Sequence, residues 1–373
     1  LHRANGNADD GPAAARSGLP VLWLGLLITA AAPLPGWVTG RQVIVGAWSD
    51  RLAVPAIFGA SMALAGLIAW LIRRFPQQAV LVSLLAGLAV GNNLRVANDY
   101  RWARVQQNRF FWQLYWRAPA IQPNTAVMAE AEVLPKTGLY STAAGINLIY
   151  AQPSPSARLP YWFYSLSREF GHRIPELVSG IPLETNFRHF SFQAQSSSSL
   201  ILYFEPSDAD CLRVLTPQDA SDPALADVVT QALPIIDLSR IQPGPGRNPS
   251  PEAAIFGPEP EHGWCYLFQK ADLARQTGDW ALVSALGDRA REQGYSLQNS
   301  QSNTPQEWIP FIEGYARTGR WQEAVEITRA ARAVEPKMTA RLCRVWKDIQ
   351  SSAPEAGTQA VVQSLLNELG CGQ

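Results

Sequence analysis

The chain has 373 residues and a formal net charge of +0, which gives no reason to expect a nucleic-acid partner. Hydrophobic residues make up 47% of it and charged residues only 17%, below the roughly 25% of ordinary soluble proteins. The deficit of charge lies near the N-terminus, which predicts helices embedded in a membrane there and argues against a wholly soluble protein.

Three apolar segments follow a polar N-terminal segment, residues 1–18. They cover residues 19–38, 52–72 and 77–95. About 20 apolar residues suffice for a helix to cross the hydrocarbon core of a bilayer, so we expect three transmembrane helices. Gly59, Ala63 and Gly66 offer the small surface at which membrane helices approach each other. A buried hairpin in a soluble core is the alternative.

The first apolar segment also has features of a secretory signal. A basic leader, the apolar run at residues 21–28 and the alanines at residues 30–32 fit a signal with its cleavage site. However, Pro33 would follow the cut, and the leader is long and contains Asp9 and Asp10. We therefore favour a helix that is retained.

The orientation depends on how the arginines are weighed. Arg73 and Arg74 lie in a very short loop between the second and third helices, which marks that loop as cytoplasmic. A plain count favours the opposite orientation, because six other arginines flank the apolar segments: Arg41, Arg51, Arg95, Arg101, Arg104 and Arg109. We favour the tight pair and predict a multi-pass protein of the cell membrane whose soluble part is extracytoplasmic. The chain begins with Leu1 instead of Met, which is compatible with a fragment of a protein that has further helices upstream.

Residues 96–118 combine aromatic side chains with arginines at helical spacing. Tryptophan and tyrosine prefer the bilayer interface, and arginine can keep its head in water above an apolar stem. We therefore predict an amphipathic juxtamembrane helix on the lipid bilayer. Its interface residues are Trp102, Phe111, Trp112, Tyr115 and Trp116. Packing under the next domain is a second interpretation, compatible with the first. Stacking on single-stranded nucleic acid is disfavoured because the rest of the chain has no basic surplus.

Residues 119–241 predict a small α/β domain. Short runs of aromatic and branched residues indicate strands at residues 125–129, 161–166, 187–193, 200–204 and 212–215. A helix is expected at residues 141–150, and Asp222 with Pro223 predicts a capped helix start. The serines at residues 196–199 predict an antiparallel hairpin between the third and fourth strands.

Two aspartates are candidate metal ligands. Asp208 and Asp210 follow a predicted strand as an Asp-x-Asp, and carboxylates suit divalent cations. This pattern resembles the metal-binding motif of nucleotide-sugar glycosyltransferases. We favour the alternative that these aspartates make hydrogen bonds within a turn. The chain has no glycine-rich phosphate loop, and we expect no cofactor.

The four cysteines are Cys211, Cys265, Cys343 and Cys371. Their wide spacing neither demands disulfides nor makes a metal site. We therefore expect four separate thiols, although an oxidising compartment would permit disulfides.

A proline-rich linker at residues 242–262 is followed by a helical region at residues 263–373. Within it, residues 307–336 resemble a tetratricopeptide repeat, a pair of antiparallel helices. The matching positions are Trp308, Phe311, Tyr315, Gly319, Trp321, Ala324, Ala331 and Pro336. Ile312 and Thr328 depart from the family pattern. A fainter copy covers residues 264–294, and two more helices are expected at residues 338–350 and 355–369.

Stacks of such repeats expose a concave surface that usually binds protein. The resemblance therefore implies a membrane protein of the cell envelope with a non-enzymatic scaffold or assembly role, and another protein as the partner of its C-terminal helices. A small helical bundle that only packs on the middle domain is the structural alternative. As a second function, the layout resembles the C-terminal part of multi-pass glycosyltransferases that use lipid-linked sugars. Asp50 is the only loop carboxylate comparable to their catalytic residues, and pairing with Arg51 at a helix start is the simpler explanation of it.

Overall fold

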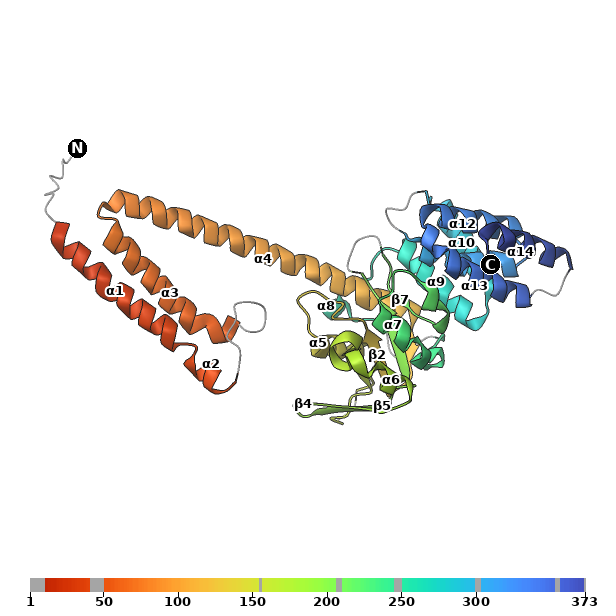
Figure 1. The fold of residues 1–373 in the computed structure, drawn as a ribbon, viewed down its shortest axis with the longest axis horizontal. Coiled ribbons are helices and arrows are strands. Elements are labelled where there is room, and N and C mark those ends of the chain that lie inside the picture. The colour runs from red at the N-terminus through yellow and green to blue at the C-terminus, as the bar shows by residue number, and fades with distance from the viewer. Residues whose placement is uncertain are drawn as a thin grey trace. The chain divides into compact units, whose positions relative to one another are not determined.

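The computed structural model describes residues 11–40, 50–153, 156–205, 210–244, 250–298, 303–352 and 356–371 (Figure 1). The chain divides into two compact units, unit 1 (Leu1–Arg101) and unit 2 (Trp102–Gln373).

The described residues of unit 1 are helical apart from short turns. The helices are α1 (Gly11–Ala31), α2 (Leu34–Val38), α3 (Asp50–Leu71) and the first part of α4 (Phe75–Arg117). Three stretches of these helices, Gly18–Val38, Leu52–Leu71 and part of α4, are long and apolar enough to cross a membrane. The three predicted apolar helices are therefore present.

Helices α1 and α3 lie antiparallel and in close contact (Figure 1). A Cβ on Gly25 would lie 2.3 Å from the backbone nitrogen of Ala63, and one on Gly66 would lie 2.4 Å from that of Leu22. Glycine is thus required where the two backbones meet, as it is in many membrane helix pairs. The small surface predicted around Gly59, Ala63 and Gly66 does contact a neighbouring helix.

Helix α4 corrects the predicted division between a third span and a separate juxtamembrane helix. It runs without interruption for 43 residues, from Phe75 to Arg117. No proline follows Pro76 within it, and the polar residues near Asn98 are tolerated in a helix interior. Because roughly 20 residues span the hydrocarbon core, the C-terminal half of α4 lies beyond a single crossing.

The sheet of unit 2 has the strand order β3-β2-β6-β7. Its strands are β2 (Thr125–Ala129), β3 (Tyr161–Ser165), β6 (Ser199–Tyr203) and β7 (Arg213–Val214). Strands β2 and β3 are parallel and joined through α5 (Leu139–Tyr150), as expected for a βαβ unit. The Asn147 side chain fixes α5 to β3, because its amide donates to the carbonyl of Tyr161 and its oxygen accepts from the Tyr161 N–H. Every residue of β2 and β3 is buried.

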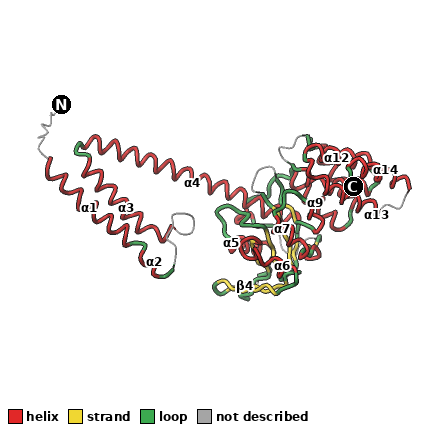
Figure 2. The backbone as a smooth tube through the Cα atoms, viewed as in Figure 1, coloured by secondary structure: helices red, strands yellow, loops and turns green. Residues whose placement is uncertain are grey.

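The predicted hairpin across the serine run is wrong. Strand β5 (Phe190–Gln195) pairs antiparallel with β4 (Pro182–Phe187), which the sequence pattern did not reveal, and β6 instead pairs parallel to β2. Figure 2 shows β4 and β5 as a separate yellow hairpin. Its turn contains Arg188 with a φ of 57°. The serines therefore connect two different sheets.

Shorter elements complete this part of unit 2. They are β1 (Ala120–Ile121), paired with β8 (Ile241–Gln242), α6 (Ile174–Val178) and α7 (Asp227–Ala232). Asp222 does not cap a helix as predicted, because α7 begins later and the Asp222 carboxylate is buried against Arg213 at 2.5 Å.

The end of α4 corrects the predicted membrane-interface residues. Phe111, Trp112 and Trp116 are buried in unit 2, and Tyr115 packs, partly buried, against the core that contains Phe111. Of the five residues, Trp102 alone is exposed. Phe111 fits against α5 so closely that a Cβ on Gly145 would lie 2.4 Å from its ring. A buried ring cannot face lipid, so the second interpretation, packing under the next domain, is the correct one for these residues.

The predicted linker is partly built into the core. Helix α8 (Ala253–Phe256) places the Phe256 ring 5.0 Å from that of Phe111. The Trp116 indole donates to Glu259 at 2.9 Å, and the Trp112 indole donates to the carbonyl of Gly257. Residues 250–262 therefore belong to the folded unit, while residues 245–249 lie outside the described residues.

The C-terminal region is helical, as predicted. Its helices are α9 (Trp264–Thr277), α10 (Trp280–Glu292), α11 (Ile309–Arg317), α12 (Trp321–Val334), α13 (Thr339–Ser352) and α14 (Ala356–Leu369). Consecutive helices pack in pairs, and α11 also contacts α9, α10 and α13. The buried apolar residues of these helices form one core, except Leu273 of α9, which packs in the core of the α/β part.

The expectation of four separate thiols is wrong. Cys211 is bonded to Cys265, and Cys343 is bonded to Cys371. The first disulfide ties the segment before β7 to α9, and the second ties α13 to the end of α14. Chain spacing did not indicate these pairs because each partner comes from a different element.

Candidate functional site

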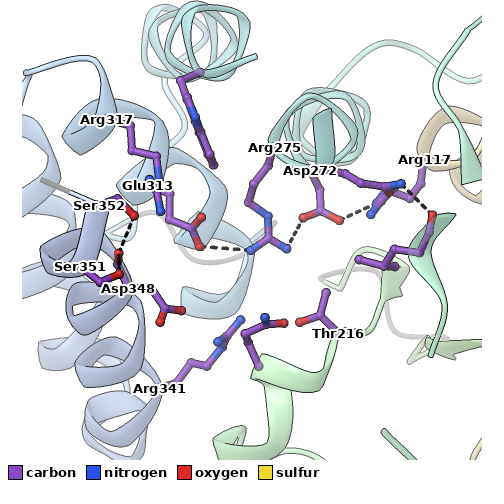
Figure 3. Close-up of a pocket in the computed structure, with 14 residues that line it drawn as sticks. Arg117, Thr216, Asp272, Arg275, Glu313, Arg317, Arg341, Asp348, Ser351 and Ser352 are labelled. Atoms are coloured by element: carbon purple, nitrogen blue, oxygen red, sulfur yellow. Dashed lines mark hydrogen bonds and ion pairs between the residues drawn. The ribbon is translucent and has the colours of Figure 1, made fainter. Parts of the chain in front are cut away.

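A cavity of 390 Å³ opens in unit 2 where α9, α11 and α13 face the end of α4 and the segment around Thr216 (Figure 3). Its volume lies in the range of small-molecule sites, about 300–1,000 Å³. The lining is rich in charge. It comprises Arg117, Thr216, Gln218, Leu238, Asp272, Arg275, Gln276, Trp280, Glu313, Arg317, Arg341, Asp348, Ser351 and Ser352.

One wall is a chain of alternating charges. Arg117 Nε donates to Asp272 Oδ2 at 2.5 Å, Arg275 lies 2.7 Å from the other oxygen of Asp272, and Arg275 also reaches Glu313 at 3.2 Å. Burial opposes the charged carboxylate, but Arg117 and Arg275 hold the pKa of Asp272 below its ordinary value. With two guanidinium groups and two carboxylates, this wall is electrically balanced.

Arg341 from α13 enters the cavity from the other side (Figure 3). Its residue is only 2% exposed, and its Nη2 pairs with Asp219 at 3.0 Å. Its Nε is buried and has no hydrogen-bond partner within the described part of the chain. Burial, assisted by the nearby charge of Arg275, lowers the pKa of Arg341 against the opposing effect of Asp219. The ion pair with Asp219 therefore does not fully offset the cost of burying the positive charge of Arg341.

Arg317 from α11 is the second cation without a full set of partners. Its guanidinium carbon lies 4.7 Å from the centre of the Trp280 ring. Its Nε is buried without a hydrogen-bond partner, and no ion pair joins it to another described residue. On the rim, Asp348 is exposed and likewise has no ion pair among the described residues. The cavity thus offers two guanidinium groups with unused donors and one carboxylate at its mouth.

Of the two candidate metal ligands, the structure describes only Asp210. Asp208 lies outside the described residues. The backbone oxygen of Asp210 accepts from Arg109 at 3.5 Å, and burial raises the pKa of its carboxyl group against the opposing charges of Arg213 and Arg109. Across the described ranges, no three His, Cys, Asp or Glu side chains are grouped to hold a metal ion. The side chain of Asp50, the candidate catalytic residue, also lies outside what the structure describes.

The residues predicted to pack the helical repeat occupy its interior or its turn. Those that are fully buried are Trp308, Phe311, Tyr315, Ala324 and Ala331. Gly319 follows α11 with a φ of 80°, Trp321 is partly buried, and Pro336 begins the next turn at the surface. The departure at Thr328 has a structural reason, because its hydroxyl accepts the indole N–H of the buried Trp346 at 3.0 Å. The tetratricopeptide assignment itself stays a prediction.

A buried carboxyl group was missed. Glu307 is 1% exposed and accepts the N–H of Cys211 at 2.8 Å and the indole N–H of Trp264. Burial raises the pKa of Glu307 to about 7, although these donors act in the opposite direction. The sequence signal was the spacing of Thr304 and Glu307, which form a capping box.

The cavity was also missed, because its residues come from separate helices. One signal was present: Asp272 and Glu313 each precede the glycine of their turn, Gly278 and Gly319, by six residues. Equivalent acidic positions on successive hairpins indicate a shared polar face. Comparison of the chain with protein-family models, with curated proteins and with solved structures finds no match in any of the three.

Proposed function

We propose that this chain is an integral membrane protein whose unit 2 lies outside the cytoplasm and binds another protein through its helical hairpins. The pairing of all four cysteines carries the proposal. Disulfides persist in oxidising compartments and are rare in the cytosol. Three helices apolar enough to span a bilayer supply the anchor.

The contacts of the later arginines support the same orientation. The Arg104 side chain donates to the carbonyl of Ile255, that of Arg109 to the carbonyl of Asp210, and that of Arg117 to Asp272. The positive charges of these residues are therefore explained by contacts within unit 2, and they do not indicate that this end of the membrane segment faces the cytoplasm. Arg104 and Arg109 then drop out of the count that opposes Arg73 and Arg74, and we give the tight pair more weight than the four arginines that remain, Arg41, Arg51, Arg95 and Arg101.

A groove on the helical hairpins is the partner surface that we propose. It has a volume of 380 Å³ and lies between the end of α10 and α12. Tyr295 and Ala330 provide the accessible apolar surface, above the buried side chains of Leu297 and Ile327. The ion pair of Arg291 and Glu326 lies beside them. An apolar floor with a charged rim is the usual composition of a protein–protein contact. The tetratricopeptide resemblance favours the same use of these helices.

Site-specific photocrosslinking in intact cells tests this proposal. A photoreactive residue at Glu326, which is exposed in the groove, is expected to give a discrete adduct with one partner protein. The matched control is Arg289, exposed on α10 but outside the groove. Equal adducts from both positions, or none from Glu326 in cells that express the full chain, would rule out the groove as a partner surface.

A further inference from the structure

We propose that the cavity lined by Arg117, Arg275, Arg317 and Arg341 binds the oxyanion of a small hydroxylated molecule, a carboxylate or a phosphate. This site is distinct from the groove on α10 and α12. It can therefore be present whether or not the hairpins bind a protein.

The unused donors are the first reason. An arginine offers five N–H donors in a fixed fork that matches carboxylate and phosphate oxygens. Arg341 uses Nη2 on Asp219 and leaves a buried Nε without a partner, and Arg317 also has a buried Nε without a partner. Buried donors are nearly always satisfied in folded proteins. An oxyanion in the cavity would supply the missing acceptor oxygens.

The distribution of charge is the second reason. The carboxylates of Asp272 and Glu313 are already engaged by Arg117 and Arg275. Asp219 has one oxygen on Arg341 and the other on the N–H and hydroxyl of Thr216. No acidic side chain within the cavity is therefore left for Arg317 except Asp348, which is exposed at the rim. A bound anion would balance the charge of Arg317 and could also accept the unused Nε–H of Arg341, whose charge is already paired with Asp219.

The remaining lining indicates a ligand with hydroxyl groups. Gln218, Ser351 and Ser352 line the cavity beside Asp348, and Figure 3 shows both serines and Asp348 on the side of α13. The Ser351 and Ser352 hydroxyls donate to the carbonyl of Asp348 at 2.8 and 3.0 Å, so their lone pairs can still accept. A purely apolar acid would leave these groups unused.

Isothermal titration calorimetry on the full chain in detergent tests the proposal with three probes: inorganic phosphate, glucuronate and the neutral sugar glucose. We expect saturable binding of at least one anion and weaker or absent binding of glucose. Binding of phosphate alone would identify a phosphate source, and binding of glucuronate alone a carboxylate source. Equal binding of glucose and glucuronate without binding of phosphate would overturn the proposal, as would the absence of binding by both anions.

Variants locate the binding. Arg317→Met should lower the affinity for the anion about tenfold, which is the loss typical of one charge-assisted hydrogen bond. Arg289→Met, on the exposed face of α10, should leave affinity unchanged. Asp348→Asn should keep or tighten binding, because it removes a negative charge from the rim. If Arg317→Met folds with an unchanged circular dichroism spectrum and binds the anion like the wild type, or if Arg289→Met weakens it equally, the cavity is not the site.

Discussion

The last residue of α4, Arg117, and Asp272 on α9 form an ion pair of 2.5 Å in which both side chains are buried. Arg117 also donates to Gln276 at 2.9 Å, and Gln276 donates to the carbonyl of Leu238 at 2.8 Å. The end of the long helix is therefore bonded both to the helical hairpins and, through Gln276, to the α/β part of unit 2.

Removal of one member of this pair should destabilise unit 2 strongly. Arg117→Met leaves Asp272 buried with only Arg275 beside it, and breaking a buried pair commonly costs about 3–5 kcal/mol. Near-UV circular dichroism of the full chain during urea unfolding measures the loss. The double variant Arg117→Met/Asp272→Leu should lose less free energy of unfolding than the two single variants lose in sum. Additive losses would show that the two groups do not interact.

The aromatic end of α4 gives a second prediction. Trp112→Ala removes a ring that is 3% exposed and should cost about 3–5 kcal/mol of the free energy of unfolding of unit 2. Trp102→Ala is the matched control, because Trp102 is 49% exposed and the loss of stability on its truncation should be much smaller. If Trp112→Ala were no more destabilising than Trp102→Ala, the burial of this segment would be refuted and the interfacial interpretation would return.

The raised pKa of Glu307 predicts a stability that falls as pH rises. The folded state holds this proton up to about pH 7, whereas the unfolded chain releases it near pH 4.5. Between these values the folded state binds more protons, so the contribution of Glu307 to stability declines by about 3 kcal/mol across that window. Below pH 4.5 the contribution is fully present.

The variant Glu307→Gln isolates this effect from other carboxyl groups. The amide cannot titrate, and its NH₂ group meets the N–H of Cys211 or the indole of Trp264 instead of accepting from it. We expect a variant that is less stable at acidic pH but whose melting temperature depends less on pH than that of the wild type. Parallel curves for the two proteins between pH 5 and 7 would contradict the prediction.

The contact between α1 and α3 can be tested inside the membrane. Gly25→Leu places a side chain where the Ala63 backbone lies and should separate the helices. The readout is a crosslink between cysteines introduced at Leu22 and Ala63, whose backbones lie against Gly66 and Gly25 of the facing helix. Gly87→Leu is the control, because a Cβ there meets nothing within 4 Å. An unchanged crosslink in the Gly25→Leu variant would show that the helices do not pack through this surface.

The sequence predicted those elements whose pattern is local. The apolar spans, the strand at residues 125–129 and the helix of the βαβ unit follow from composition and spacing alone, and the structure has them. The prediction that the aromatic stretch lies on the bilayer was wrong for a physical reason. Tryptophan and arginine suit both a bilayer surface and a buried contact with carbonyl and carboxylate partners. Only the positions of Gly257, Glu259 and Asp272 decide between the two.

The cavity and the disulfides could not be predicted because they depend on tertiary contacts. Arg317 and Arg341 belong to different hairpins, and Cys211 and Cys265 are separated by 54 residues. The predicted hairpin between β5 and β6 was wrong because apolar and polar residues alternate only weakly at residues 182–187. As a result, β4 was not recognised as the partner of β5.

Thiol labelling in intact cells tests the central claim, an anchored unit 2 outside the cytoplasm, most directly. A membrane-impermeant maleimide is applied to cells that express the variant Arg289→Cys, whose new thiol lies on the exposed side of α10. We predict labelling of this residue without lysis, while the four native cysteines react only after reduction. Labelling that requires lysis, with native cysteines that react without a reductant, would place unit 2 in the cytoplasm and contradict the account.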